Sequence, residues 1–390
     1  MSRNIYLDNS ATTRISDVAL AKYNEISREC FGNPSSLHGL GFGAEKVVEA
    51  ARKSVLTSLG ARDASVIFTA SGSEANNLAL IGRALAKERY MRGAKIITTA
   101  GEHASVDEPL GRLEAMGFRI ARIPTVGGVL DLEALEHEMT GDVILVSMMM
   151  VNNETGALYD VKSAAAIVKA KSREALFHID ATQSYMKLPM NMRTLGADMI
   201  TLSSHKIGGP KGVGALVVSS QVIKTRGLAP IILGGGQEGG MRSGTENVPG
   251  IAAFGAAVEE RAAALTESSK KMAELREYLV EKLTRGAAFA EISITNPEYH
   301  APHILNITLP KIKSETMLHF LSAEGIFVSS GSACSSNSRH ISSALVAYGR
   351  TEAEADCSIR ISFSPDNSRE DVDALCDALE RGLMRLVRIR

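Results

Sequence analysis

Residues 175–220 read ALFHIDATQSYMKLPMNMRTLGADMITLSSHKIGGPKGVGALVVSS, and three short apolar runs in this segment each end at polar residues. The runs ALFHID, DMITLSS and VGALVVSS have the length and apolar content of buried strands. Alternation of such runs with amphipathic helical patterns extends back to about Asp63. This alternation predicts βαβ units on a mainly parallel sheet, which is an α/β fold.

The rest of the chain predicts a second, smaller domain. The run DVILVSMMMV, residues 142–151, is apolar on both faces and should be a central strand of the first sheet. A helical pattern from about Ile251 to Arg285 follows the sheet region, and a mixed α+β region comes after it. We therefore predict a large domain of residues 18–262 and a small domain of residues 1–17 and 263–390.

The composition is that of a globular protein. The chain has 390 residues, of which 45% are hydrophobic and 22% charged, and it is long enough to bury a sizeable core. Its 43 Lys and Arg nearly balance its 44 Asp and Glu, so no overall field would recruit nucleic acid or an anionic membrane. No apolar run resembles a signal peptide or a membrane span. We therefore expect a cytoplasmic protein with no direct nucleic-acid or membrane partner.

Four cysteines lie far apart and form neither a CxxC pair nor a cluster with zinc-like spacing, so we expect free thiols and no metal site. Cys30, Cys357 and Cys376 stand where a small apolar residue would serve. Cys334 is different, because it lies in SSGSACSSNS, a tract without an apolar face that could bury it. The sequence therefore predicts that Cys334 is an exposed and reactive thiol.

Polar clusters follow several predicted strands, and in open α/β sheets ligands bind beyond the carboxyl ends of the strands. After SVIFT, the residues Ser71, Gly72, Ser73 and Glu74 begin a helix. They could bind an anion through the main-chain N–H groups and the hydroxyls. The alternative is an ordinary capping box formed by Ser71 and Glu74, and the motif alone favours that capping.

Two further clusters allow two interpretations each. His103 follows the strand pattern AKIITT, but a lone histidine is more often a structural residue. The motif VNNETG, residues 151–156, interrupts the most apolar strand with Asn152, Asn153 and Glu154. Buried polar groups there would need partners, and a plain turn fits as well.

The most informative cluster follows the strands of residues 175–220. Asp180 and Gln183 come after one strand, and Ser203, His205 and Lys206 come after the next. A lysine directly after a buried strand is unusual, because ammonium groups avoid desolvation. An aldehyde cofactor would explain it, with Lys206 forming an imine and Asp180 pairing with a pyridinium nitrogen. A structural ion pair of Lys206 remains the alternative.

Glycine-rich stretches do not indicate a nucleotide site. GGPKGVG and GGGQEGG lack the Lys-Ser/Thr of a phosphate-binding P-loop, and GLGFG at residues 39–43 follows a turn-rich segment instead of a strand. We therefore exclude ATP and NAD. The glycine run before residues 241–245 is either a loop that offers donors to an anion or a solvated surface loop.

Ten motifs, in their order along the chain, resemble the cysteine desulfurases of the NifS/IscS type, which have the class V aminotransferase fold. These motifs are YLDNSATT, FGNPSSLH, SGSEANNLA, GEHASV, VNNETG, HIDATQS, SSHKIGGPKGVGAL, GGGQEGGMRSGTEN, SSGSACSS and SIRISF. The resemblance implies a pyridoxal 5'-phosphate enzyme of fold type I. It also implies a large domain with a mainly parallel sheet sandwiched by helices, and a smaller α+β domain.

The resemblance implies roles for the matching positions. Lys206 would hold the cofactor as an imine, Asp180 would pair with its ring nitrogen, and His103 would stack on the ring and help to move protons. Further cofactor contacts are implied for Gly72, Ser73, Asn153, Gln183, Ser203, His205 and Thr245. Thr245 would reach the phosphate bound by a neighbouring subunit, which implies a homodimer. Asn33 and Arg360 would bind the substrate carboxylate.

The implied reaction converts L-cysteine to L-alanine. Lys206, once displaced from the imine, would act as the base, and the Cys334 thiolate would attack the substrate sulfur. The sulfur would leave Cys334 for an acceptor protein, which could be an iron–sulfur scaffold, a tRNA-thiolation enzyme or another carrier. Two other hypotheses stay open from the residues alone: a transaminase or lyase that uses the same cofactor, and a binding or carrier protein without catalysis.

Overall fold

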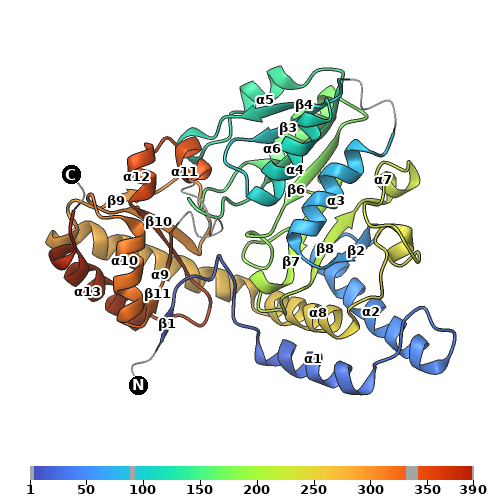
Figure 1. Ribbon diagram of the computed structural model, residues 1–390, viewed down its shortest axis with the longest axis horizontal. Helices are drawn as coiled ribbons and strands as arrows, with labels where there is room; N and C mark the ends of the chain where they lie inside the picture. Colours follow the sequence, from blue (N-terminus) through green and yellow to red (C-terminus); the bar gives the residue numbers. More distant parts are fainter. Residues whose placement is uncertain (1–3, 88–92, 331–340, 389–390) are drawn as a thin grey trace.

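The computed structural model describes residues 4–87, 93–330 and 341–388, and a seven-stranded sheet lies at the centre of the larger part (Figure 1). The strand order is β2-β8-β7-β6-β5-β3-β4. The strands are β2 (Ser65–Thr69), β3 (Lys95–Thr99), β4 (Arg119–Ile123), β5 (Val143–Met149), β6 (Leu176–Asp180), β7 (Met199–Ser203) and β8 (Gly214–Val218). Only β8 runs antiparallel to its neighbours, so the predicted mainly parallel sheet is confirmed.

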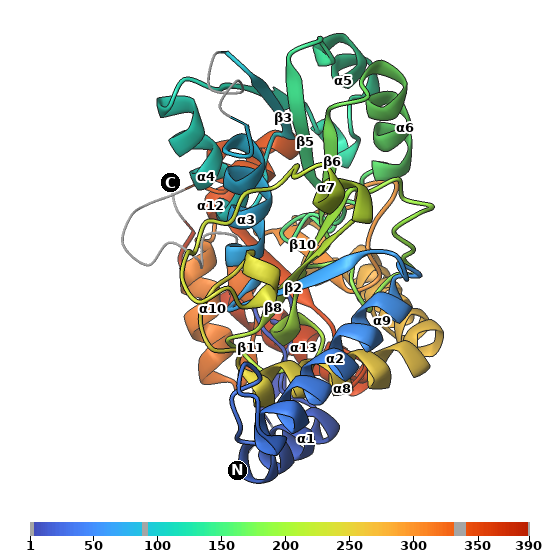
Figure 2. The same ribbon diagram turned by 90° about the vertical axis from the view of Figure 1, so that its right-hand side faces the viewer.

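Helices cover both faces of this sheet, as predicted. Successive strand residues alternate between two cores; in β2, Ile67 packs toward α3, α4 and α7, whereas Val66 and Phe68 pack toward α2, α6 and α8. Figure 2 shows α3 and α4 on one side of the central strands and α5 and α6 on the other. The helices are α1 (Asp17–Glu29), α2 (Gly39–Ser58), α3 (Gly72–Ala84), α4 (Ala104–Ala115), α5 (Leu132–Glu138), α6 (Val161–Lys171), α7 (Ser220–Lys224) and α8 (Val248–Ala263).

A smaller antiparallel sheet with the order β12-β13-β10-β9 forms a separate core with the C-terminal helices. Its strands are β9 (Ser293–Thr295), β10 (Ile304–Thr308), β12 (Ser329–Ser330) and β13 (Ser358–Ser362). Strand β1 (Ile5–Tyr6) pairs in parallel with β11 (Ile326–Phe327), so the N-terminal strand joins this part of the molecule. The helices here are α9 (Leu265–Arg285), α10 (Ser314–Ala323), α11 (Ser343–Tyr348), α12 (Glu352–Asp356) and α13 (Arg369–Arg385).

The single long helical pattern expected over residues 251–285 is two helices, α8 and α9, which meet at Ala264. The division has a packing reason. Phe254 of α8 lies in the core of the large sheet, whereas Met272 and Leu279 of α9 lie in the core of the small sheet. A domain boundary at residues 262–263 fits this change of core and stays a prediction.

Three cysteines in the described part of the chain, Cys30, Cys357 and Cys376, are free thiols, and the last two are buried. Cys334 lies outside the described residues. Among the residues that the structure describes, none of the helices is long and apolar enough to cross a bilayer.

Candidate active site

Asp180, at the end of β6, is held in a buried network at the carboxyl edge of the large sheet. Nδ2 of Asn76 donates to Asp180 Oδ2 at 2.8 Å and to Ser105 Oγ at 2.9 Å. Asp180 Oδ1 accepts the main-chain N–H of Thr182 at 2.9 Å. The Ser105 hydroxyl in turn lies 2.8 Å from Nδ1 of His103. The network therefore joins the ends of two strands, β6 and β3, through helix α3.

His103 precedes α4 as its N-cap residue, and its ring nitrogen Nδ1 accepts the main-chain N–H of Ser105 at 3.1 Å. Burial lowers the pKa of His103, the charge of Asp180 opposes that shift, and Lys206 and Arg360 add to it. The imidazole is therefore neutral at pH 7 and, by this hydrogen bonding, carries its hydrogen on Nε2. Asp180, Lys206 and Arg360, which are all predicted site residues, thus act electrostatically on His103.

Lys206 ends a single turn of 3-10 helix, Ser204–Lys206, that follows β7. Its amino group donates to the carbonyl of Ser10 at 2.5 Å and to the carbonyl of Ala11 at 2.9 Å. Gln183 Nε2 donates to the same Ser10 carbonyl at 2.9 Å. The N-terminal segment thus brings together Lys206 and Gln183, which follow neighbouring strands of the sheet.

His205 is fixed by the same N-terminal segment. Its Nδ1 lies 3.0 Å from the Thr12 hydroxyl, and its carbonyl accepts from the N–H and the hydroxyl of Thr13. Burial and then the positive charges of Lys206, Lys211 and Lys187 lower the pKa of His205 to about 4. His205 is therefore a neutral ring at physiological pH.

Arg360, in β13 of the small sheet, reaches the large sheet. Its guanidinium bonds the Asp8 carboxylate at 2.8 Å and the carbonyl of Asn153 at 2.9 Å. The remaining nitrogen, Nε, is buried and has no hydrogen-bond partner within the described residues. Asp8 and Asn153 thus fix one edge of the guanidinium and leave one donor for another group.

The start of α3 lies against the ends of β6 and β7. A Cβ atom at Gly72 would lie 3.1 Å from Ser203 Cβ and 3.4 Å from Thr182 Oγ1, so a larger residue would fit only if these neighbours moved by a few tenths of an ångström. Ser71 caps α3 by accepting the N–H of Glu74 at 3.1 Å. The first N–H groups of a helix have no partner inside it, so this cap and a phosphate site at Gly72 and Ser73 are compatible.

The motif VNNETG forms a turn closed by a buried side chain. Asn152 Oδ1 accepts the main-chain N–H groups of Glu154 and Thr155, both at 2.9 Å, and Asn152 Nδ2 donates to the Gly101 carbonyl. The turn interpretation therefore holds for Asn152. It also explains why the carbonyl of Asn153 is presented to Arg360.

Three predicted site residues are not brought into this cluster. Asn33 is exposed in the connection between α1 and α2, at the end of the molecule opposite the small sheet in Figure 1, and its Oδ1 accepts the N–H of Ser35. Thr245 lines a cavity of about 170 Å³ beside Ala70, at the end of β2. Cys334 is not among the described residues. The roles predicted for all three stay predictions.

The structure adds residues that sequence reasoning missed: Asp8, Ser10, Ala11, Asn76 and Ser105. Asn76 had a detectable signal, because this amide falls on the helical face of Ala75 and Ala79, which are fully buried. The carbonyls of Ser10 and Ala11 had none, because main-chain atoms carry no residue-specific signal.

The residues of this cluster fit pyridoxal phosphate. Within the described part of the chain, Asn76 Oδ1, Gln183 Oε1 and Arg360 Nε are buried without partners, and such atoms normally have one. The fixed carboxylate of Asp180 suits a protonated ring nitrogen. The amine of Lys206 suits an aldehyde, and the start of α3 together with Ser203 suits a phosphate. The cluster thus supplies a partner for each functional group of this cofactor.

Residues 5–375 match the sequence profile of the family described as aminotransferase class-V. The chain belongs to this family. Class-V aminotransferases depend on pyridoxal phosphate and have fold type I, so the predicted cofactor and fold are confirmed.

Named relatives of this class-V aminotransferase cover nearly its whole length. It is 37% identical to "Cysteine desulfurase IscS 1" of Archaeoglobus fulgidus, over 98% of this chain and 97% of the relative. It is 39% identical to the "NifS/IcsS protein homolog" of Lactobacillus delbrueckii, over 96% of each chain. Two solved structures are similar: a "NIFS-LIKE PROTEIN" (TM-score 0.90, 36% identity, 98% of this chain and 100% of that one) and a NifS-like protein from Rickettsia africae (TM-score 0.85, 34% identity, 97% and 99%).

Proposed function

We propose that this chain is a cysteine desulfurase, which converts L-cysteine to L-alanine and transfers the sulfur to Cys334 as a persulfide. The observation that carries the proposal is the meeting of Lys206 and Gln183 at Ser10, beside the network of Asp180 and His103. Full-length relatives named cysteine desulfurase support the same activity.

Bound pyridoxal phosphate would supply an electron sink for the α-carbon of an amino acid. Asp180 would keep a negative charge at the ring nitrogen, and Asn76 with the N–H of Thr182 holds that carboxylate in place. Lys206 would hold the cofactor and, once released, take the α-proton on its amine. His103, neutral and with its hydrogen on Nε2, can stack on a ring and pass a proton.

Arg360 would bind the substrate carboxylate through the N–H that has no partner within the described residues. Asp8 and the Asn153 carbonyl would hold the guanidinium while it does so. The connection between α1 and α2, which carries Asn33, lies at the end of the molecule opposite the small sheet in Figure 1, so the predicted contact of Asn33 with the substrate carboxylate would involve a second copy. The homodimer predicted from Thr245 would supply that copy.

Sulfur transfer would follow at Cys334. The thiolate attacks the substrate sulfur, a sulfur–sulfur bond forms, and the carbon–sulfur bond breaks with its electron pair left on the carbon. Protonation of that carbon leads to alanine, so the step needs no external oxidant or reductant. The persulfide would then be passed to an acceptor protein that serves iron–sulfur cluster assembly or tRNA thiolation, in the cytoplasm.

The proposal is tested by incubating the purified holoenzyme with L-cysteine and measuring alanine and sulfide in the presence of a thiol reductant. The wild-type protein should form both in equal amounts, and Cys334→Ser should keep the cofactor but release neither above background. Ketoacid-dependent amino transfer that is unaffected by Cys334→Ser would instead identify a transaminase.

A further inference from the structure

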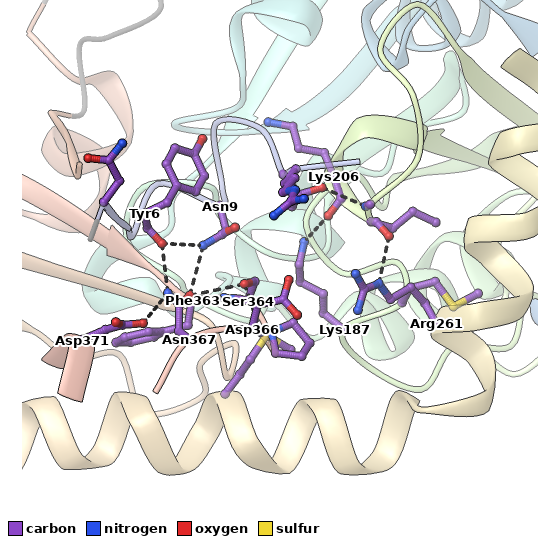
Figure 3. A pocket seen from close by; sticks show the side chains of 18 residues that line it. Tyr6, Asn9, Lys187, Lys206, Arg261, Phe363, Ser364, Asp366, Asn367 and Asp371 are labelled. Atoms are coloured by element: carbon purple, nitrogen blue, oxygen red, sulfur yellow. Dashed lines mark hydrogen bonds between the residues drawn. The ribbon is translucent and has the colours of Figure 1, made fainter. Parts of the chain in front are cut away.

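Lys187 is a second lysine beside Lys206. It follows β6 in the loop that also carries Gln183, and only 5% of its surface is exposed. Its amino group donates to the main-chain carbonyl of Lys206 at 2.9 Å, and Figure 3 shows it directed at that carbonyl. Lys187 therefore contacts the main chain of the residue that would hold the cofactor.

The charge of Lys187 is not neutralised locally. Within the described residues it forms no ion pair with a carboxylate, although Asp366 and Asp371 line the same cavity of about 310 Å³. Burial, followed by the charges of Lys206 and Arg261, lowers the pKa of Lys187 to about 7. A buried amine without a counter-charge lowers the stability of a fold, so a role in the site explains its position better than packing does.

Arg261, in α8, acts on the same segment. Its Nε donates to the carbonyl of Ile207 at 3.2 Å, directly after the carbonyl that Lys187 holds. The Thr13 hydroxyl accepts the N–H of Gly208 at 2.8 Å. Lys187, Arg261 and Thr13 thus hold the two consecutive peptide groups that directly follow Lys206.

We propose that Lys187 is a positioning residue: it holds the main-chain carbonyl of Lys206 and so fixes the direction in which the Lys206 side chain leaves the sheet. The proposal deepens the function proposed above and rests on it. The other titratable or charged groups that interact electrostatically with Lys187 or Lys206 are Arg261 of α8, His103 before α4, His205 of the 3-10 turn and His303 before β10; Lys211 and Arg360 act in turn on His205 and on His103 and His303.

The test compares Lys187→Met, which removes the donor, with Lys187→Arg, which keeps one, in the full-length holoenzyme. Hydrogen–deuterium exchange of the peptide that spans residues 203–213 is the first measurement. Loss of one hydrogen bond should accelerate exchange of its amides about two- to tenfold in Lys187→Met and leave Lys187→Arg near the wild-type rate. Lys95→Met is the control at a remote site, because Lys95 of β3 is also a buried lysine that donates to a carbonyl, that of Glu138, although it additionally pairs with the Glu138 carboxylate.

Steady-state kinetics provides the second measurement. Misplacement of Lys206 should lower kcat of Lys187→Met about 10- to 100-fold, with KM for cysteine changed less than about threefold and activity restored in Lys187→Arg. The melting temperature should not fall in Lys187→Met. Unchanged exchange and kcat, or a fall in melting temperature with kcat intact, would contradict the proposal.

Two design points keep the outcome decisive. If Lys187→Met does not fold, Lys187→Gln is measured instead, because its shorter amide cannot reproduce the same contact, and the same changes are expected. Failure of the proposed function is recognised separately, because the wild-type protein would then form no alanine and sulfide, whereas the exchange measurement does not depend on activity.

Discussion

At the scale of single residues, the site is defined by side chains that fix one another. Asp180 is the clearest case, since each of its oxygens accepts a hydrogen bond, one from Asn76 and one from the main chain of Thr182. The pair of Asn76 and Asn77 allows a matched comparison of a buried and a more exposed amide one position apart. Asn77 donates back to the carbonyl of Ser73 within its own helix α3.

We expect Asn76→Ala to lower kcat about tenfold, because a charged acceptor loses a donor that is worth about 1.5–3 kcal/mol. Asn77→Ala should stay within about twofold of the wild-type activity. Both variants are compared by alanine formation from cysteine at saturating substrate, with thermal unfolding as the check on folding. Equal activity in Asn76→Ala and Asn77→Ala would show that the contact with Asp180 has no functional role.

His103 should titrate below its ordinary pKa of about 6.5, because burial outweighs the attraction of Asp180. Since its pKa is lowered, the ring stays neutral as the pH falls to 6.5 and takes up a proton only below that value. NMR of histidine-labelled protein follows the titration, and the His103→Gln variant assigns the signal. A midpoint at or above pH 6.5 would be inconsistent with a neutral, buried imidazole.

At the scale of elements, the site depends on how closely helix α3 approaches the sheet. Gly214 begins β8, and a Cβ atom there would lie 2.4 Å from the main-chain carbon of Ser71, directly before the helix. The sequence predicted both the strand and the helix start, but not that a glycine between them permits their contact. Such contacts depend on strand order, which the motifs did not specify.

We expect Gly214→Ala to weaken retention of pyridoxal phosphate, because the added methyl group displaces the start of α3 from Ser203. Gly141→Ala is the control, since a Cβ atom at Gly141 has nothing within 4 Å. Equilibrium dialysis with cofactor absorbance should show a dissociation constant raised about tenfold or more for Gly214→Ala alone. Identical retention in the two variants would refute this role of Gly214.

Glu102, which follows β3, should make the free energy of unfolding of the protein depend on pH. Burial raises the pKa of Glu102 to about 8, although it accepts bonds from Thr99 and from the N–H of Met149. A raised carboxyl pKa contributes stability that is fully present below the unfolded value of about 4.3 and is lost as the pH rises toward 8.

Urea unfolding should therefore show that wild-type stability falls between pH 5 and pH 8, with a contribution from Glu102 of up to about 1.4 kcal/mol per pH unit. Glu102→Gln should remove that slope, and the exposed Glu133→Gln should keep it. The same slope in all three proteins would show that Glu102 is ionised in the folded state.

At the scale of the whole molecule, residues 8–13 connect the two sheets. Asp8 contacts Arg360 of the small sheet, and the carbonyls of Ser10 and Ala11 receive Lys206 of the large sheet. The sequence predicted Lys206 and Arg360 as site residues because their types and motifs carry chemistry. It could not predict the acceptors of Lys206, which are main-chain atoms up to 196 positions away. The second copy that we propose for the contacts of Asn33 and Thr245 also lies beyond a single chain.

The most direct test of the central claim is mass spectrometry of the holoenzyme after reaction with one equivalent of L-cysteine. The account predicts that the peptide carrying Cys334 gains the mass of one sulfur atom, that the gain is lost on reduction, and that one alanine forms for each sulfur bound. Alanine formed while Cys334 stays unmodified, or sulfur found instead on Cys30, Cys357 or Cys376, would contradict it.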